Sequence, residues 1–208
     1  MKFAVFISGN GTNLQAIIDA CKRGHIKSRL ALVVSTNTTA FGLKRAQKAG
    51  ITTFVFESKN YTNPQSIDRD MAIQLKKEKI DFIVLAGYMR MLTRYFIKQY
   101  HRKILNIHPA LLPSFKGTHG IKDAFTYGAK VTGVTVHFAD DKMDHGPIIL
   151  QEPLKIYEHD TLAALEPRIH KLEHKLYPKA ISLFEQHRLK IKGRRVTILD
   201  APPAAHAK

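Results

Sequence analysis

The sequence predicts an α/β fold: a doubly wound, mostly parallel and twisted sheet with helices on both faces. Apolar runs rich in β-branched residues recur along the 208-residue chain, and helical patterns separate the early runs. The early runs are almost continuously apolar, which is typical of strands that are covered on both faces. The expected strands are residues 2–7, 30–35, 52–56, 81–86, 103–108, 131–138 and 147–156.

The helical patterns lie near residues 13–23, 41–49, 64–79, 93–100 and 121–128, and a longer one spans about 160–186. In this last pattern leucine and isoleucine recur at spacings of three and four, which indicates a core-facing stripe: Leu162, Leu165, Ile169, Leu172 and Leu176. Pro167 lies inside the pattern and cannot donate the helical hydrogen bond, so we expect a kink or a restart there. Residues 201–208 are expected to form a flexible tail.

Charge and composition narrow the function classes. The chain carries 33 Lys and Arg against 17 Asp and Glu, a formal net charge of +16. Such an excess often indicates a nucleic-acid partner. The basic residues are scattered, without a run of five, so we interpret the charge as solubility together with anionic small substrates. A basic nucleic-acid-binding protein stays as the alternative.

The sequence also predicts a compartment. It contains no run of 18 apolar residues, so we expect no membrane partner. The first strand pattern, residues 2–7, is too short and too soon interrupted to be a signal peptide. A single cysteine, Cys21, allows no internal disulfide. These features favour a cytoplasmic protein.

Residues 8–13, with the sequence Ser-Gly-Asn-Gly-Thr-Asn, follow the first strand and lead into a helix. Glycines let the backbone approach an anion, and a helix N-terminus supplies free N–H groups. A dinucleotide site is disfavoured because position 14 is leucine and the second strand ends in Ser-Thr-Asn at 35–37, without an acidic residue. The loop therefore indicates a phosphate monoester; a tight turn without a ligand stays open.

A second motif, residues 170–174, reads His-Lys-Leu-Glu-His and matches the pattern of one class of zinc peptidases. Such a site needs a third protein ligand, and only Glu185 and Asp200 are acidic farther along the chain. We therefore expect no metal, and interpret Glu173 as pointing from the helix into a polar cleft. A solvated helix face is the plain alternative.

Asn106 and His108 stand two apart at the end of the fifth strand, so their side chains should share one face. An amide donor stabilises a developing oxyanion, and an imidazole moves a proton near neutral pH. Asp144 follows in the next long loop and is expected to orient His108 and to raise its pKa. Taken alone, the pair could equally satisfy the backbone at a strand end.

Together these segments resemble the folate-dependent phosphoribosylglycinamide formyltransferases. The likeness follows the same order over nearly the whole chain. It is carried by residues 7–17 (Ile-Ser-Gly-Asn-Gly-Thr-Asn-Leu-Gln-Ala-Ile), 84–90 (Val-Leu-Ala-Gly-Tyr-Met-Arg), 105–113 (Leu-Asn-Ile-His-Pro-Ala-Leu-Leu-Pro), and 136–138 with 144–149 (Val-His-Phe and Asp-His-Gly-Pro-Ile-Ile).

The resemblance implies transfer of the formyl group of the co-substrate 10-formyltetrahydrofolate to the amine of 5′-phosphoribosylglycinamide (GAR), which gives formyl-GAR and tetrahydrofolate in purine biosynthesis. It implies a Rossmann-like formyltransferase domain over residues 1–200. Residues 1–100 would form a phosphate-binding half, and residues 101–200 a catalytic and folate-binding half. Direct attack through a tetrahedral intermediate requires no protein nucleophile and no metal.

By the same resemblance, Asn106 and His108 stabilise the intermediate and Asp144 orients them. The residues that would bind GAR are Asn10, Gly11, Thr12, Asn13 and Glu173. The residues that would bind the folate are Leu85, Met89, Arg90, Met91, Leu92, Asn106, Asp140 and Asp141.

Two positions depart from the family pattern. His145 stands where many members have glycine, which should alter the loop that carries Asp144. Pro64 stands where some members have an arginine that contacts the folate, and Lys59 is the candidate substitute.

Sister activities stay as alternatives. A methionyl-tRNA formyltransferase would suit the positive charge but normally has an additional C-terminal domain, for which we count too few residues. A 10-formyltetrahydrofolate hydrolase normally has an additional N-terminal domain, whereas the first strand here begins at residue 2. The loop at residues 8–13 favours GAR, so the expected partners are small molecules, with the chain as a monomer or homodimer.

Overall fold

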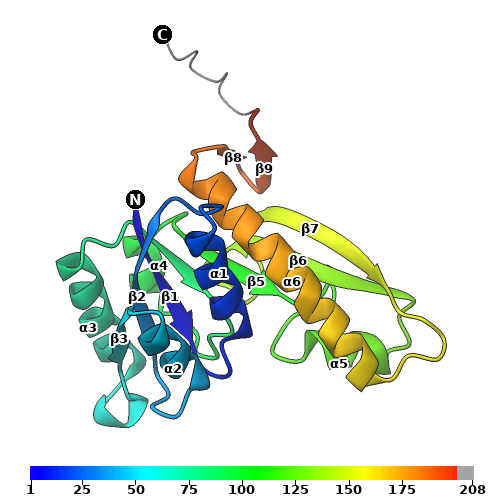
Figure 1. The fold of residues 1–208 in the computed structure, drawn as a ribbon, viewed down its shortest axis with the longest axis horizontal. Coiled ribbons are helices and arrows are strands. Elements are labelled where there is room, and N and C mark those ends of the chain that lie inside the picture. The colour runs from blue at the N-terminus through cyan, green and yellow to red at the C-terminus, as the bar shows by residue number, and fades with distance from the viewer. Residues whose placement is uncertain (201–208) are drawn as a thin grey trace.

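The computed structural model describes residues 1–200 and has a seven-stranded sheet at its centre (Figure 1). The strands are β1 (Lys2–Ile7), β2 (Arg29–Ser35), β3 (Thr52–Val55), β4 (Phe82–Leu85), β5 (Ile104–His108), β6 (Val131–Phe138) and β7 (Ile148–Lys155). Their order is β3-β2-β1-β4-β5-β6-β7; the first five are parallel, and β6 and β7 run antiparallel to their neighbours. The predicted fold class is confirmed.

Helices cover both faces of this sheet, as predicted (Figure 1). They are α1 (Thr12–Lys22), α2 (Phe41–Lys48), α3 (Pro64–Lys77), α4 (Arg94–Gln99), α5 (Gly120–Thr126) and α6 (Leu162–Glu185), with a short 3₁₀ helix, η1, at Ser58–Asn60. Strand β1 shows how the two cores arise. Phe3 and Val5 face the core formed with α1 and α6, whereas Ala4 and Phe6 face the core formed with α3 and α4. This alternation explains why the strand is apolar at every position.

Helix α6 is continuous from Leu162 to Glu185, so the expected restart at Pro167 is wrong. Pro167 is exposed, where water can satisfy the carbonyl that loses its helical donor. Tertiary contacts hold the helix on the sheet. Tyr177 is fully buried, and its hydroxyl donates toward the carbonyl oxygens of Leu85 and Leu105, at 2.8 and 2.9 Å.

A hairpin of β8 (Leu189–Lys192) and β9 (Arg195–Ile198) follows α6 and was not predicted. Its strands are only four residues long, so their period-two pattern is a weak signal. Their apolar side chains pack against the main core. The predicted tail, 201–208, lies outside the described residues. Within residues 1–200, no helix combines the length and apolarity needed to cross a bilayer.

The topology determines where a ligand can bind. Strand β1 lies between β2 and β4, so the chain leaves the sheet in opposite directions after β1 and after β4. A crevice forms at the carboxyl edge of a parallel sheet where the strand order reverses in this way. The loops after β1 and β4, and the end of β5, therefore meet at one edge.

Candidate active site

A cavity of about 780 Å³ opens at this edge of the sheet. Its wall combines the loop after β1, the loop after β4, the end of β5, the segment before α5, the β6–β7 loop and the first turns of α6. All but one of the predicted site residues line it: Asn10, Gly11, Thr12, Asn13, Leu85, Met89, Arg90, Met91, Leu92, Asn106, His108, Asp140, Asp144 and Glu173. The exception is Asp141.

The loop after β1 has the geometry of an anion site. Gly11 adopts a left-handed conformation, with φ of 74°, immediately before α1. A Cβ atom there would lie 2.7 Å from the Cα atom of Gly42, so the loop backbone approaches α2 closely. No side chain caps the N-terminus of α1, and Thr12 and Asn13 of its first turn line the cavity.

Arg45, which the sequence analysis did not single out, holds this loop from α2. Its guanidinium donates from Nε to the carbonyl oxygen of Asn10 and from Nη2 to the Asn10 side-chain oxygen, both at 2.9 Å. It also stacks over the ring of Phe41, at 5.0 Å from the ring centroid. The Lys44–Arg45 pair looks like ordinary surface charge in the sequence, and only the packing of α2 reveals its contact with the loop.

Glu173 joins α6 to the same loop. It is 4% exposed, and its Oε2 accepts hydrogen bonds from the Asn13 amide at 3.2 Å and from His170 Nδ1 at 2.8 Å. The hydrogen bond to Glu173 raises the pKa of His170. Glu173 therefore lines the polar cleft, and His170 is its hydrogen-bond partner on α6.

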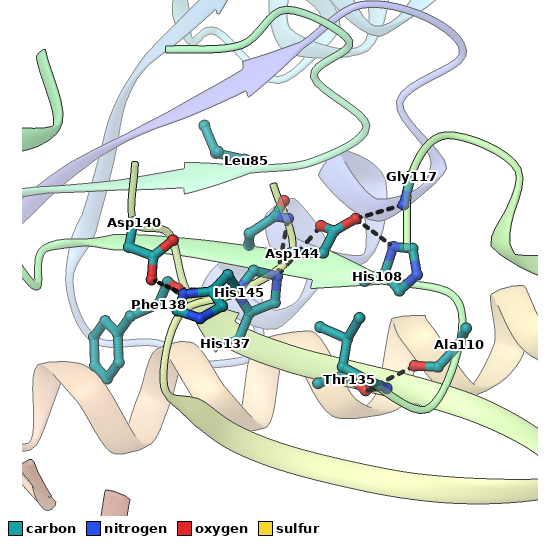
Figure 2. A network of polar contacts seen from close by, with 12 residues as sticks. Leu85, His108, Ala110, Gly117, Thr135, His137, Phe138, Asp140, Asp144 and His145 are labelled. Atoms are coloured by element: carbon teal, nitrogen blue, oxygen red, sulfur yellow. Dashed lines mark hydrogen bonds and ion pairs between the residues drawn. The ribbon is translucent and has the colours of Figure 1, made fainter. Parts of the chain in front are cut away.

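Asn106 and His108 both line the cavity from β5. Asp144 reaches His108 from the β6–β7 loop (Figure 2). The Asp144 carboxylate lies 3.4 Å from His108 Nδ1. The structure adds His137, which lies opposite Asn106 across the antiparallel pair β5–β6. His137 Nε2 lies 3.1 Å from Asn106 Nδ2 and 3.7 Å from Asp144. The carboxamide, the carboxylate and two imidazoles thus converge at one point.

His137 could have been found by its position, because it stands within the family-like segment at 136–138 and lies one residue before the end of a strand. Its Nδ1 lies 2.9 Å from the carbonyl oxygen of Phe138, which can only accept a hydrogen bond. The proton therefore belongs on Nδ1, and Nε2 accepts from the amide of Asn106. This chain of donors orients the amide.

The expected rise in the pKa of His108 is wrong. The side chain is buried, and this burial lowers the pKa below its ordinary value, although the charge of Asp144 acts in the opposite direction. Its Nε2 donates to the carbonyl oxygen of Phe115 at 2.7 Å, which leaves Nδ1 beside Asp144. Nδ1 is therefore the ring atom that can gain or lose a proton beside the Asp144 carboxylate.

Asp144 itself is held in an unusual conformation. Its φ is 47°, in the left-handed region that non-glycine residues rarely adopt. The N–H of Gly117 donates to its carboxylate at 2.8 Å. Burial would raise the pKa of Asp144, but the hydrogen bond from the Gly117 N–H and the nearby His108 hold it below its usual value. The carboxylate therefore stays charged.

An Asp144→Asn variant tests this electrostatic account. It removes the carboxylate that raises the pKa of His108 but keeps the shape of the side chain, so the pKa should fall further below its ordinary value. NMR titration of the His108 ring measures this. Asp141→Asn is the matched control, because Asp141 pairs with Arg94 at the surface and should leave His108 unchanged. An equal or higher pKa in Asp144→Asn would contradict the account.

The predicted folate residues form the other end of the cavity. Leu85 and Leu92 are buried, whereas Met89 and Met91 are 67% and 50% exposed and present flexible apolar side chains. Such a wall suits a flat aromatic ring. The prediction that Asp141 lines the folate end of the cavity is wrong. Its carboxylate turns outward and pairs with Arg94 at 2.8 Å.

Arg90 lines the cavity, but its guanidinium is committed elsewhere. It pairs with Asp68, a fully buried carboxylate of α3, and donates to the hydroxyl of Tyr88 at 3.2 Å. Asp68 also accepts the backbone N–H of Thr93 at 2.7 Å. The pair therefore shapes the loop after β4, and Asp68 is a supporting residue that no motif of the sequence indicates.

Neither Pro64 nor its candidate substitute, Lys59, lines the cavity. Pro64 occupies the first turn of α3, where the missing N–H costs no helical hydrogen bond. Lys59 does not line the cavity, so it is no substitute for the family arginine. Its ammonium is exposed and pairs with Glu57 at 2.7 Å.

Comparisons with known proteins agree with this geometry. A family model described as formyl transferase matches residues 1–181. Phosphoribosylglycinamide formyltransferase of Bacillus subtilis (strain 168) is 46% identical over 180 residues, which cover 86% of this chain and 92% of that protein. The protein of the same name from Escherichia coli (strain K12) is 41% identical over 191 residues, which cover 92% and 90%.

A solved structure shows the same architecture. The crystal structure of glycinamide ribonucleotide transformylase 1 from Symbiobacterium toebii superposes with a TM-score of 0.94 at 44% identity, over 96% of this chain and 94% of that chain. The chain therefore belongs to the formyl transferase family, as an enzyme related to the phosphoribosylglycinamide formyltransferases.

Proposed function

We propose that this enzyme transfers the formyl group of 10-formyltetrahydrofolate to the amine of GAR, giving formyl-GAR and tetrahydrofolate in purine biosynthesis. One observation carries the proposal: a single cavity holds an anion loop at one end, an apolar wall at the other, and the Asn106–His108–Asp144 cluster along its wall. The names of the relatives support the same reaction.

GAR would bind at the polar end of the cavity. Its phosphate would accept hydrogen bonds from the backbone N–H groups of Gly11, Thr12 and Asn13, where the N-terminus of α1 adds positive potential. The Glu173 carboxylate, held beside Asn13, would accept hydrogen bonds from the sugar hydroxyls. These contacts would leave the glycinamide amine extended toward β5.

The folate would enter at the other end of the cavity. Leu85, Leu92 and the exposed methionines of the loop after β4 would cover the faces of its ring system. Asp140, on the β6–β7 loop, would meet the polar edge of the ring. The formyl group would then lie between the amine of GAR and the side chains of Asn106 and His108.

The residues can carry the transfer in two steps. The amine of GAR forms a C–N bond to the formyl carbon, and the amide of Asn106 donates to the resulting oxyanion. His108 Nδ1 accepts the proton that the amine loses, and Asp144 stabilises the imidazolium. The imidazolium then returns the proton to the departing folate nitrogen as the old C–N bond breaks.

No protein nucleophile takes part in this sequence of steps. The single thiol, Cys21, lies in α1 away from the cavity wall, and burial raises its pKa to about 11. A thiol with such a pKa stays protonated near neutrality and is a poor nucleophile. Direct transfer between the two substrates is therefore the route that the side chains support.

The assay combines purified protein, GAR and a 10-formyl folate analogue, and follows the deformylated folate spectrophotometrically. GAR-dependent release, with stoichiometric formyl-GAR, is the expected result. A reaction without GAR is the control: release at the same rate would identify a hydrolase instead. No release under either condition would refute the proposal.

Gly11→Val tests the phosphate end of the cavity. The larger side chain would collide with Gly42 and force the loop backbone away from its position, so the KM for GAR should rise by about tenfold or more while the KM for the folate changes little. Steady-state kinetics with each substrate varied in turn measures the difference. Gly50→Val is the matched control, because Gly50 has a similar φ of 70° but open space around it. Equal weakening of both substrates would indicate a folding defect instead.

A further inference from the structure

The turn of the β8–β9 hairpin contacts the loop that carries Asp144. Arg194, in this turn, donates from Nη2 to the carbonyl oxygen of His145 at 2.5 Å. Its Nη1 lies 3.2 Å from each ring nitrogen of His145, so the guanidinium lies against the imidazole. Arg194, some fifty positions along the chain, thus binds both the backbone and the ring of His145, the residue that follows Asp144.

His145 also binds Asp140, a residue of the cavity wall. Its Nδ1 lies 2.8 Å from the Asp140 carboxylate, as Figure 2 shows. A carboxylate can only accept, so Nδ1 carries the proton and Nε2 is the acceptor for Arg194. Asp140 also accepts the backbone N–H of Lys142 at 3.0 Å. Arg194, His145 and Asp140 therefore connect the hairpin to both ends of the β6–β7 loop.

The backbone conformation of Asp144 explains why the β6–β7 loop needs a restraint. Asp144 has a φ of 47°, a strained conformation for a residue with a side chain, which persists only where neighbouring contacts maintain it. On the cavity side, the N–H of Gly117 holds its carboxylate. Without a second restraint, the backbone at Asp144 could relax and move the carboxylate away from His108.

The hairpin is a firm support for Arg194. Leu189, Ile191 and Val196 pack against the main core, and β9 lies beside β7. The turn itself is Gly193–Arg194, with Gly193 at a φ of 60°, as a two-residue turn of type II′ requires at its first position. This turn aims Arg194 at the start of β7, where the Asp144 loop ends.

We propose that Arg194 is a positioning residue for formyl transfer, which acts through His145 to hold the 139–146 loop with Asp144 against His108. The inference rests on the proposed function for its effect on turnover. Its structural part, the restraint of the loop by the hairpin, stands on the contacts alone. The C-terminal hairpin is thereby a part of the catalytic apparatus that touches no substrate.

Arg194→Ala should lower kcat by roughly five- to twentyfold, less than the roughly 10²-fold that a full 1 Å misplacement can cost. The KM for GAR should stay within about twofold, because the phosphate loop is remote from the hairpin. Hydrogen exchange should quicken in residues 139–146 and stay unchanged in α1. Arg195→Ala, which removes the same charge one position along the hairpin, is the control and should match the wild type in both measurements.

A double-mutant cycle with His145→Gly separates positioning from general stability. If Arg194 acts through His145, the double variant should lose far less than the product of the two single losses. Multiplicative losses, or an Arg194→Ala variant with wild-type kcat and wild-type exchange, would overturn the inference. A wild-type enzyme without formyl transfer would refute the proposed function instead, and the exchange measurement would still decide whether the hairpin restrains the loop.

Discussion

Replacing His108 with alanine should lower kcat by about 10²- to 10⁴-fold, the range expected for loss of a general acid–base. The reason is its geometry, because the imidazole is buried in the cavity wall and its Nδ1 lies 3.4 Å from the Asp144 carboxylate. Under the proposed mechanism, the variant would leave the amine of GAR without a base and the folate nitrogen without a proton donor. Steady-state assays with both substrates saturating measure the loss.

The same variant also tests whether His108 contributes to substrate binding. Because the phosphate loop and the apolar wall remain, the KM values for GAR and the folate should change little. His101→Ala is the matched control, since His101 is exposed in the turn before β5 and should be inert. A loss below tenfold in His108→Ala would contradict the assigned role, and a coincident fall in melting temperature would point to a packing effect.

Asn106→Ala should lower kcat by about 10²-fold or more, as loss of one oxyanion donor does in other acyl transfers. The amide of Asn106 faces the cavity from β5, and His137 Nε2 lies 3.1 Å from its Nδ2. One N–H is thus used to fix the orientation, and the other is free for the developing oxyanion. The interaction forms mainly in the transition state, so kcat should fall more than the KM values rise.

Asn106→Asp sharpens this experiment. It keeps the size of the side chain but replaces a donor with a carboxylate that repels an oxyanion, so its loss should equal or exceed that of alanine. Asn60→Ala, in the exposed η1 turn, is the control. Substantial activity in Asn106→Asp would show that the donor is another group.

Much of this site could be predicted because its signals are local in the sequence. The glycines of the first loop, the two-residue spacing of Asn106 and His108, and the position of each at the end of a strand are all visible before folding. The carboxyl ends of parallel strands meet at one edge of a sheet, so the predicted topology already brings these groups together. Strand β5 and the loop after β1 lie where this reasoning places them.

The supporting residues could not be predicted in the same way. Arg45 and Asp68 act through partners that lie 35 and 22 positions away, and no local pattern distinguishes them from ordinary surface or core residues. Asp141 was predicted to bind the folate together with Asp140, which precedes it in the sequence. The turn instead directs its side chain outward to Arg94. Direction and partner depend on the path of the loop.

The strands and helices of the main sheet, the glycine loop after β1 and the three groups on which the proposed chemistry depends could all be read from the sequence. These follow from periodicity, from backbone requirements such as that of Gly11, and from spacing along one strand. The lowered pKa of His108, the contacts that hold Asp144 and the contact of the hairpin through Arg194 became visible only in the folded chain. Burial and contacts between distant segments control these properties, and neither exists until the chain has folded.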